Sequence, residues 1–437
     1  MIPLLQSHRQ PVAWNRHGPI DGRTFLGDVY HLSERLPTTG NAILNVCEDR
    51  YRFLVTLTAG LVCKRPNLLP PSTVPEALKQ VVSDRERPVC VTDGVPCPEG
   101  VACVEFHEPP GCSAPSERIP AFSGDQIMAE VFTSGSTGRP RSNPKRWGEM
   151  VSGATRIGRR LGLDQDERGS LVATVPPQHM FGLETSIMLG LRWGWGFHTG
   201  RPFFPRNLAE ALSEVPEPRI LITTPLHLRA CIAEKTALPG LRFILSATAP
   251  LSTEMARTAE RQFGCPVQEI YGSTETGAMA SRRSAEGTGW EPFEGFRIHR
   301  EGSHWLAEAD HLSRPVRLDD RLKENGDGTL ELLGRTADLV KIAGKRGSLG
   351  DLNHKLHSID GVEDGTFLVP HASDGDVHRL AAVVVAPTRT KRELLQELGK
   401  RIDPVFLPRP LQCVKALPRN ASGKLSRERL LKLLSKT

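Results

Sequence analysis

Residues 131–141 read Val-Phe-Thr-Ser-Gly-Ser-Thr-Gly-Arg-Pro-Arg and guide the interpretation of this chain. A strand-like segment, 126–132, precedes them, and a helix-like run begins at Lys145. The two glycines permit backbone turns that a side chain would block. The hydroxyls and free backbone N–H groups of such a loop can point at phosphate oxygens. No Gly-Lys-Ser/Thr ending closes the loop, so it is not a Walker loop, and a Ser/Gly-rich surface turn stays open as the alternative.

Three further stretches follow this loop along the chain. They are Tyr271-Gly-Ser-Thr-Glu275, Gly-Arg-Thr-Ala-Asp-Leu-Val-Lys-Ile-Ala-Gly-Lys-Arg at 334–346, and Leu-Pro-Arg-Asn-Ala-Ser-Gly-Lys at 417–424. In this order and spacing the four stretches resemble the core motifs of the adenylate-forming superfamily. That superfamily includes acyl- and aryl-CoA synthetases, peptide-synthetase adenylation domains and luciferases. The resemblance runs from about residue 120 to the C-terminus, and residues 1–120 carry no motif that we recognise.

The composition is that of an ordinary globular protein. The 437 residues suffice for two or three domains, and 38% are hydrophobic and 24% charged. The net charge of +6 is modest and evenly spread, so we expect no nucleic-acid partner. A mildly basic protein suits an anionic substrate such as ATP, or an acidic protein partner.

The sequence shows no sign of a membrane protein or a secreted one. No run of 18 apolar residues predicts a membrane span, and the N-terminus lacks the apolar core of a signal peptide, so we expect a cytoplasmic protein. The nine cysteines are an odd number and are scattered, which favours free thiols in a reducing compartment. The one cluster, Cys90, Cys97, Cys103 and Cys112, matches no standard zinc spacing.

The first half of the chain alternates strand and helix patterns. Residues 41–47 and 88–93 read as short strands, and 50–63 and 74–82 as helices. Such alternation predicts a parallel α/β layer. Because this region is shorter than in most members of the superfamily, the resemblance implies that part of their N-terminal subdomain is trimmed here.

The middle of the chain alternates more clearly. Strands are predicted at 219–224, 242–247 and 267–271, and helices at 225–235 and 252–262, the second between an N-cap at Ser252 and a C-cap at Gly264. The Tyr-Gly-Ser-Thr-Glu stretch then begins at the carboxyl end of a strand, where α/β sheets bind ligands.

The pattern changes after Thr336. Residues 362–369 and 380–385 read as strands, and 391–402 as an amphipathic helix whose leucines we assign to the core. We therefore predict an α/β fold with a large N-terminal domain of parallel or mixed sheets and packed helices, 1–335. A small mobile α+β lid, 336–437, follows it. The resemblance places the lid's hinge just after Gly334-Arg335.

The chemistry that the resemblance implies explains its residue types. A carboxylate does not react with a thiol, because oxide would have to leave, whereas a mixed anhydride with AMP has a good leaving group. The enzyme must hold ATP and the acid together and neutralise both. This requires phosphate-cradling N–H groups, a metal ion and a cation at the α-phosphate.

By resemblance, the first two motifs bind the phosphates. Arg141 stands where the superfamily usually has lysine, Glu275 resembles the carboxylate that holds Mg²⁺, and Thr274 would lie near the α-phosphate. A solvated loop acid is the alternative for Glu275. The residues expected to hold the β- and γ-phosphates are Thr133, Ser134, Gly135, Ser136, Thr137 and Gly138.

Other positions resemble the nucleoside and lid motifs. Asp320 would accept both ribose hydroxyls, although the adjacent Asp319 leaves the register open by one. The remaining nucleotide-binding candidates are the adenine-side turn Ala247, Thr248 and Ala249, then Tyr271 and Gly272, and finally Arg335 and Arg346.

Lys424 resembles the lid lysine that bridges the acid and the α-phosphate, a role that suits a long flexible cation. A surface lysine in a basic tail is the alternative. One departure concerns the hinge: the usual Asp or Lys, two residues after the motif arginine, is Ala337 here, and Asp338 follows it.

The acid pocket is expected around His179 and Phe181, although His179 could also be a merely packed or solvated residue. Gly344 would line the tunnel of the pantetheine thiol. Amino-acid-activating relatives have an Asp near the pocket to bind the ammonium. None is present, but Glu184 is a charged residue within reach. A plain acyl or aryl acid is therefore the preferred substrate.

These patterns predict an ATP- and Mg²⁺-dependent ligase that forms an acyl-AMP and passes the acyl group to a phosphopantetheine thiol. The acceptor is coenzyme A or an acyl carrier protein, and the basic charge slightly favours the acidic carrier. Two alternatives remain: an amino-acid-adenylating enzyme, and a degenerate homologue that binds nucleotide without turnover.

Overall fold

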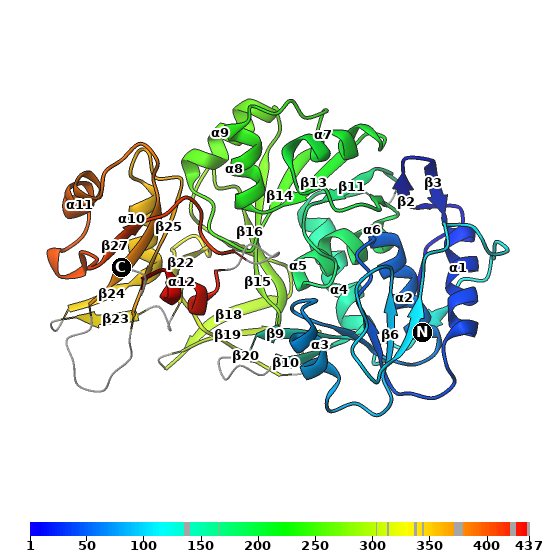
Figure 1. The fold of residues 1–437 in the computed structure, drawn as a ribbon. Helices are drawn as coiled ribbons and strands as arrows, with labels where there is room; N and C mark the ends of the chain where they lie inside the picture. The colour runs from blue at the N-terminus through cyan, green and yellow to red at the C-terminus, as the bar shows by residue number, and fades with distance from the viewer. Residues whose placement is uncertain are drawn as a thin grey trace. The chain divides into compact units, whose positions relative to one another are not determined.

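The computed structural model describes residues 1–134, 140–164, 166–302, 304–312, 314–335, 339–342, 345–370, 379–419 and 425–434 (Figure 1). The chain divides into two units. The first comprises Met1–Arg297 and Glu308–Val316, and the second Ile298–Ala307 and Arg317–Thr437. The domain boundary predicted at 335/336 marks a hinge about which the lid would move. Residues 336–338 lie outside the described residues, so this boundary stays a prediction.

The first unit contains a six-stranded sheet in its N-terminal part. Its strands, in spatial order, are β10 (Pro140–Arg146), β9 (Ile127–Ser134), β5 (Asn67–Leu69), β4 (Ile43–Asn45), β6 (Val89–Thr92) and β7 (Ala102–Glu105). Every pair is parallel except β9–β10. The parallel α/β layer predicted for the first half of the chain is therefore present.

A nine-stranded sheet forms the rest of this unit. Its strands, in spatial order, are β17 (Glu291–Pro292), β16 (Gly277–Arg282), β15 (Val267–Ser273), β14 (Phe243–Ser246), β13 (Arg219–Thr223), β11 (Ser170–Ala173), β12 (Gly196–His198), β2 (Pro11–Asn15) and β3 (Gly18–Asp21). The chain runs from β11 to β12 on one side and then to β13 on the other. Strand β11 is thus a topological switch point, where open α/β sheets bind ligands beyond the carboxyl ends of their strands.

Helices cover these sheets, and several begin or end at the predicted residues. For α9, the Ser252 hydroxyl accepts the N–H of Met255 at 3.2 Å, and Gly264 ends the helix with φ +68°. The helical segments of this unit are α1 (Gly22–Arg35), α2 (Arg50–Val62), α3 (Pro75–Val82), α4 (Trp147–Arg160), α5 (Met180–Gly182), the π-helical η1 (Leu183–Met188), α6 (Leu189–Trp193), α7 (Pro205–Ser213), α8 (Pro225–Ala233) and α9 (Thr253–Phe263).

Smaller sheets complete the chain. A two-stranded sheet joins β1 (Ile2–Pro3) and β8 (Ala121–Phe122). A three-stranded sheet has the order β18 (Phe296–Glu301), β19 (His304–Ala309) and β20 (Val316–Leu318).

The second unit is an α+β structure with a core of its own. Its hairpins are β21 (Asp320–Glu324) with β22 (Leu330–Arg335), and β23 (Leu339–Ile342) with β24 (Lys345–Ser348). A three-stranded sheet is formed by β25 (Asp364–Leu368), β26 (Ala381–Val385) and β27 (Leu411–Cys413). The helices are α10 (Leu349–His357), α11 (Lys391–Gly399), the 3-10 turn η3 (Pro404–Phe406) and α12 (Arg427–Leu434). The leucines of α11 pack in this core, as predicted.

Two expectations are wrong. The helix-like run expected from Lys145 begins at Trp147, because residues 140–146 form strand β10, antiparallel to β9. The prediction of free thiols also fails for two of the nine cysteines, because Cys97 and Cys103 form a disulfide with their Cα atoms 6.2 Å apart. Cys90 and Cys112, the other members of the sequence cluster, are free.

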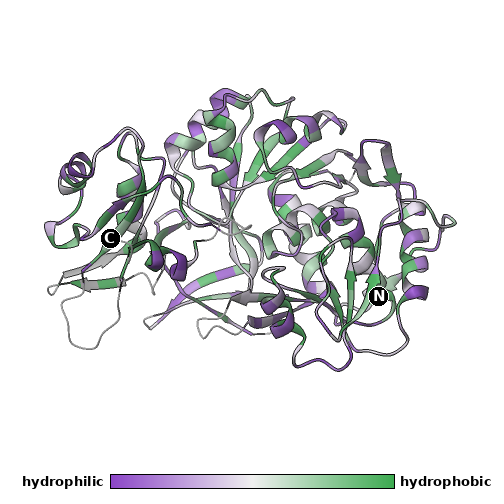
Figure 2. Cartoon of the chain, in the orientation of Figure 1, coloured by the Kyte–Doolittle hydropathy of each residue, from purple (hydrophilic) through white to green (hydrophobic). Residues whose placement is uncertain are grey.

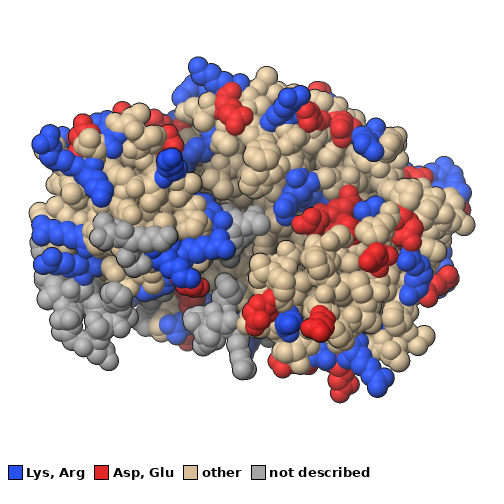
Figure 3. Space-filling model, in the orientation of Figure 1, with Lys and Arg blue, Asp and Glu red and all other residues tan. Residues whose placement is uncertain are grey.

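The distribution of residue types agrees with this architecture. Hydrophobic residues follow the central strands, and hydrophilic residues gather on the outer faces of the helices (Figure 2). Basic and acidic side chains are interspersed over most of the face shown in Figure 3. None of the helices in the described part of the chain is long and apolar enough to cross a membrane.

Candidate active site

Three of the predicted motif segments follow the carboxyl ends of neighbouring parallel strands. Strands β11, β13, β14 and β15 are consecutive and parallel in the sheet. Residues 174–179 follow β11, residues 247–249 follow β14, and the Tyr-Gly-Ser-Thr-Glu stretch begins within β15. Since the carboxyl ends of parallel strands share one edge, the sheet gathers these segments at the edge where ligands bind.

The turn after β14 has an unusual backbone conformation. Thr248 has φ +77°, a value that β-branched residues rarely adopt. Ala247 is buried, and Thr248 and Ala249 are exposed. Because backbone strain of this kind concentrates at functional sites, the geometry is consistent with the expected adenine-side role.

The stretch from Tyr271 to Glu275 forms the end of β15 and the turn into β16. The ring of Tyr271 is buried against Trp290, with their centroids 5.5 Å apart. Within the turn, the backbone N–H of Ser273 donates to the hydroxyl of Thr276 and the N–H of Thr276 to the hydroxyl of Ser273, each at 3.2 Å. These reciprocal bonds close the turn and leave Thr274 and Glu275 half-buried at its tip.

The donor set at Glu275 fits a magnesium ion that is shared with a nucleotide. In the described part of the chain, no group of three or more His, Cys, Asp or Glu residues could hold a metal ion. Mg²⁺ is commonly bound by one or two carboxylates together with substrate phosphates, which one half-buried carboxylate satisfies.

The phosphate-loop candidates lie only partly within the described residues. Thr133 is half-buried on β9, and Arg141 is exposed directly opposite it on β10. The amide of Asn143, also on β10, contacts the hydroxyl of Thr133 at 3.5 Å. Ser134 ends β9, and Gly135, Ser136, Thr137 and Gly138 lie outside the described residues.

The acid-pocket candidates lie after the switch strand. His179 is the N-cap residue of α5 and is half-buried, and its carbonyl accepts the N–H of Leu183 at 2.8 Å. Phe181 is half-buried and packs against the main core. The structure brings both residues to the ligand edge of the sheet.

Arg50, which no sequence motif singled out, holds the segment that leads to His179. Its guanidinium is fully buried and donates to the carbonyls of Ala173 and Val175 at 3.1 and 2.9 Å, and to the hydroxyl of Ser186. Burial lowers the pKa of Arg50 to about 9, so the side chain remains charged at neutral pH. Charge-assisted bonds to two carbonyls at the end of β11 and to a hydroxyl on η1 fix the path of the chain between these elements.

Glu184 is not a substrate-facing residue. It lies on η1, is 5% exposed, and accepts the N–H of Ala278 at 3.1 Å. Burial raises the pKa of Glu184 to about 7, while Lys145 and the Ala278 N–H act in the opposite direction. Lys145 is itself 6% exposed and donates from Nζ to the carbonyl of Glu275 at 3.2 Å. No spacing rule could have found this pair, since Lys145 lies in an apparent helix start.

The ribose candidates lie together in the second unit. Asp320 begins β21, and Arg335 ends β22 directly opposite it in the antiparallel pair. Asp320 is half-buried whereas Asp319 is exposed, which favours the expected register. The side chains of Arg335 and Arg346 lie outside the described part of the chain, although Arg346 is placed on β24.

The remaining lid candidates lie outside the described residues. Lys424 and Gly344 belong to this group, as do the hinge positions Ala337 and Asp338. The residues that flank the lysine segment are described: Arg419 and Leu425 form an antiparallel bridge across 420–424.

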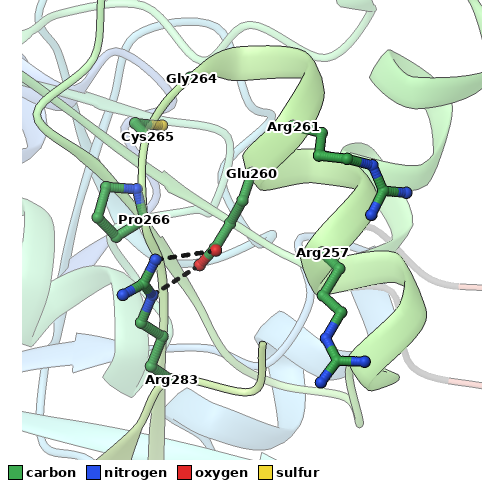
Figure 4. A pocket seen from close by; sticks show the side chains of 7 residues that line it. All are labelled: Arg257, Glu260, Arg261, Gly264, Cys265, Pro266 and Arg283. Atoms are coloured by element: carbon green, nitrogen blue, oxygen red, sulfur yellow. Dashed lines mark hydrogen bonds and ion pairs between the residues drawn. The ribbon is translucent and has the colours of Figure 1, made fainter. Parts of the chain in front are cut away.

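A surface depression of about 380 Å³ lies away from these candidates (Figure 4). It is found at the amino-terminal end of β15, where Arg283 makes two bonds to the Glu260 carboxylate at 2.9 and 3.0 Å. Its lining residues are Arg257, Glu260, Arg261, Gly264, Cys265, Pro266 and Arg283. None of them is a predicted site residue.

Comparison with known proteins agrees with the motifs. Residues 42–295, more than half of the chain, match the model of the family described as AMP-binding enzyme. The match begins well before residue 120, so the expectation that the resemblance starts near that point was too narrow.

Two relatives are 4-coumarate–CoA ligases. The enzyme of Halorhodospira halophila is 28% identical over 310 residues, covering 67% of this chain and 73% of the relative. That of Rhodobacter capsulatus is 28% identical over 311 residues, covering 70% and 76%.

Among solved structures, o-succinylbenzoate coenzyme A synthetase from Bacillus subtilis shares the fold. Its complex with ATP and magnesium ion has a TM-score of 0.82 at 17% identity, covering 97% of this chain and 96% of that one. Its complex with the acyl-adenylate intermediate has a TM-score of 0.81 at 18% identity, covering 97% and 95%. From the family match and the shared fold it follows that the chain belongs to the AMP-binding enzyme family, the adenylate-forming superfamily that its four motifs resemble.

Proposed function

We propose that this protein activates a carboxylic acid with ATP as an acyl-AMP and then transfers the acyl group to a phosphopantetheine thiol. The observation that carries the proposal is the gathering of three motif segments at one sheet edge: the 247–249 turn, the Tyr271–Glu275 stretch and the segment that bears His179. The reaction needs a site for the adenine, a site for the phosphates and their metal ion, and a site for the acid, and these three segments would supply them in that order.

In the first half-reaction a carboxylate oxygen attacks the α-phosphorus of ATP, forming the acyl-AMP anhydride and releasing pyrophosphate. In the second, the thiolate sulfur attacks the acyl carbon, forming the thioester and releasing AMP. Magnesium, when bound, neutralises phosphate charge. Arg141 and Thr274 would stabilise the phosphates, and Lys424 would bridge the acid and the α-phosphate.

A plain acyl or aryl acid is the better substrate class. The acidic residue that could have bound a substrate ammonium, Glu184, is buried and accepts the N–H of Ala278. An amino acid would therefore lack its partner at this position. The two relatives described above are named for an aryl acid, 4-coumarate.

The acceptor thiol is that of coenzyme A or of an acyl carrier protein. The names of the relatives point to coenzyme A. The net charge of +6 suits the acidic carrier, although it also suits the phosphates of coenzyme A. A cytoplasmic location and the lack of a nucleic-acid partner stay predictions.

Pyrophosphate exchange into ATP, measured across a panel of acyl, aryl and amino acids, tests this proposal. We expect exchange that depends on Mg²⁺ and on an aryl or acyl acid. Exchange only with amino acids would favour the amino-acid-activating alternative. ATP binding without exchange on any acid would favour the degenerate homologue. Adding coenzyme A or a holo carrier protein to the active acid then identifies the acceptor by the thioester formed.

Glu275→Gln separates the metal role from a general effect on the fold. The variant should lose exchange at millimolar Mg²⁺ while its circular dichroism is unchanged. Glu254→Gln is the matched control, because Glu254 is an exposed acid in the first turn of α9 on the same unit. Full activity of the Glu275 variant would remove this residue from the metal site.

A further inference from the structure

Two buried side chains, one basic and one acidic, contact the backbone of the turn that carries Thr274 and Glu275. Lys145 comes from β10 and Glu184 from η1, and they are 6% and 5% exposed. Lysine and glutamate are almost never this buried unless they are paired. For each of them, the other is the foremost charged neighbour.

Both side chains form hydrogen bonds with the backbone of the turn. The Nζ of Lys145 donates to the carbonyl oxygen of Glu275 at 3.2 Å. The carboxylate of Glu184 accepts the N–H of Ala278, with Oε2 at 3.1 Å and Oε1 at 3.3 Å. The turn is therefore held on its carbonyl side by the ammonium of Lys145 and on its N–H side by the carboxyl group of Glu184. This is the polarity that each backbone group requires.

Gly277 shows how closely Glu184 approaches. The residue has φ +70°, and a Cβ atom there would clash with Oε1 of Glu184. Only a glycine permits both the backbone conformation and this close approach. The carboxylate of Glu184 thus occupies the space that a side chain at residue 277 would need.

The two side chains also connect the turn to the other site segments. Strand β10 follows directly on residues 135–139 of the phosphate-binding motif, and Lys145 lies near its end. Helix η1 follows α5, which begins just after His179, and π-helical turns of this kind are frequent at functional sites. Through their separate bonds to the turn, Lys145 and Glu184 therefore link strand β10, the segment after His179 and the Tyr271–Glu275 stretch.

We propose that Lys145 and Glu184 are positioning residues that hold residues 273–278 in register with the phosphate strand and the acid segment, so that Glu275 is presented for Mg²⁺. This inference rests on the proposed function. Stability alone does not explain the pair, because replacing buried charges by apolar side chains is often neutral or stabilising. The geometry assigns them to the alignment of the turn.

The test compares Lys145→Met, Glu184→Gln and the double variant with the parent protein. Gln has the length of Glu, and Met is an unbranched side chain one atom shorter than Lys. The amide oxygen introduced by Glu184→Gln would still accept the N–H of Ala278, so the changes remove charge more than volume. Isothermal titration calorimetry measures ATP affinity with Mg²⁺ and with EDTA, without turnover. Pyrophosphate exchange gives the half-saturating Mg²⁺ concentration.

We expect each single variant to lose about tenfold or more of the ATP affinity that Mg²⁺ contributes, and to leave the affinity in EDTA nearly unchanged. The half-saturating Mg²⁺ concentration should rise by a similar factor. Because both groups align one turn, the effect in the double variant should be smaller than the product of the single effects.

Glu269→Gln is the matched control. Glu269 is 2% exposed on β15 and accepts the Nε of Arg282 at 2.7 Å, so it is another buried acid–cation pair on the same hairpin, at the end away from the turn. This variant should lose stability without any change in Mg²⁺ dependence.

Several outcomes would overturn the proposal. One is unchanged Mg²⁺ dependence in folded Lys145 and Glu184 variants. Another is the same shift in the Glu269 control. Failure of both single variants to fold would also refute it, because the pair would then be a requirement of the core. A parent protein that binds ATP but exchanges no pyrophosphate would instead refute the proposed function, and the calorimetric comparison would still decide the positioning role.

Discussion

Arg419 and Asp364 form a two-point ion pair in the second unit, with Nε to Oδ2 at 2.9 Å and Nη2 to Oδ1 at 2.7 Å. The side chains are 22% and 14% exposed. Arg419 also pairs with Leu425 across residues 420–424, so the ion pair anchors one end of the segment that contains Lys424. Burial would raise the pKa of Asp364, but the imidazole of His357, with Nε2 3.6 Å from Oδ1, and the hydrogen bonds from Arg419 hold it well below its usual range.

Asp364→Asn should therefore destabilise the second unit. Removing the charge leaves a largely buried guanidinium without its anion, at a cost of about 1–3 kcal/mol. Urea unfolding at neutral pH measures the loss. Asp360→Asn is the control, because Asp360 is fully exposed in its pair with Arg389 and should matter little. Equal losses in the two variants would contradict the anchoring role.

Lys424→Ala should slow the formation of acyl-AMP by about 10²-fold or more, the scale for one preorganised electrostatic group. Supplied with synthetic acyl-AMP, the same variant should form thioester at nearly the parent rate, because the lysine's charge is useful only while negative charge builds up. Rapid-quench assays of the two half-reactions measure both rates. Lys432→Ala, in an exposed pair with Glu428, is the control and should leave both rates unchanged.

Gly344→Trp should show the opposite profile, with normal adenylation and a blocked thiol step, because the indole would fill the thiol tunnel. The same two assays measure it. Equal damage to both half-reactions in the Lys424 and Gly344 variants would refute the two-state lid.

The resemblance places a hinge just after Gly334-Arg335, and we expect this junction to be accessible to proteases. Limited trypsin digestion is expected to cleave near this junction, next to Arg335, and ATP with the acid should slow that cleavage. Mass spectrometry of the fragments locates the cut. Cleavage confined to the interior of either predicted domain would show that the boundary is misplaced.

Stability should fall in mild acid because of His227. Burial, reinforced by Arg201, lowers the pKa of His227 from 6.5 to about 4 in the folded protein. Between these values the unfolded chain binds more protons, so the free energy of unfolding decreases as the pH falls from about 6.5 to about 4. The expected change is about 1–3 kcal/mol.

Urea unfolding across this pH range tests the assignment. His227→Gln should make the profile shallower without flattening it, because burial also lowers the pKa of His311 to about 4. His17→Gln, at an exposed position, should leave the profile unchanged. A profile that keeps its slope in the His227 variant would assign the acid sensitivity to other groups.

The residues that were predictable from sequence lie in segments with local signals. Ser252 and Gly264 mark the two ends of helix α9, and the strand-like run that follows them forms β15. The placement of Glu275 after β15 follows from these local signals. Strand β10 has no such signal, because Pro-Arg-Ser-Asn-Pro-Lys-Arg lacks alternation and becomes a strand only by pairing with β9.

The surroundings of Glu184 could not be predicted from the sequence for a related reason. Its backbone partner Ala278 lies 94 residues away in the sequence. A single acid in an apolar segment does not reveal whether it faces a pocket or the core. A local sequence pattern carries no information on such long-range contacts. The buried position of Glu184 therefore became visible only in the three-dimensional structure.

The left-handed backbone at Thr248 has a thermodynamic consequence for nucleotide binding. A β-branched residue in that conformation costs about 1–3 kcal/mol, and the cost is met during folding by the surrounding structure. The turn is therefore already shaped before any nucleotide arrives, and little ordering entropy remains to be lost on binding. A nucleotide that occupies this turn would meet a rigid surface, and its affinity would be set by fit more than by induced rearrangement.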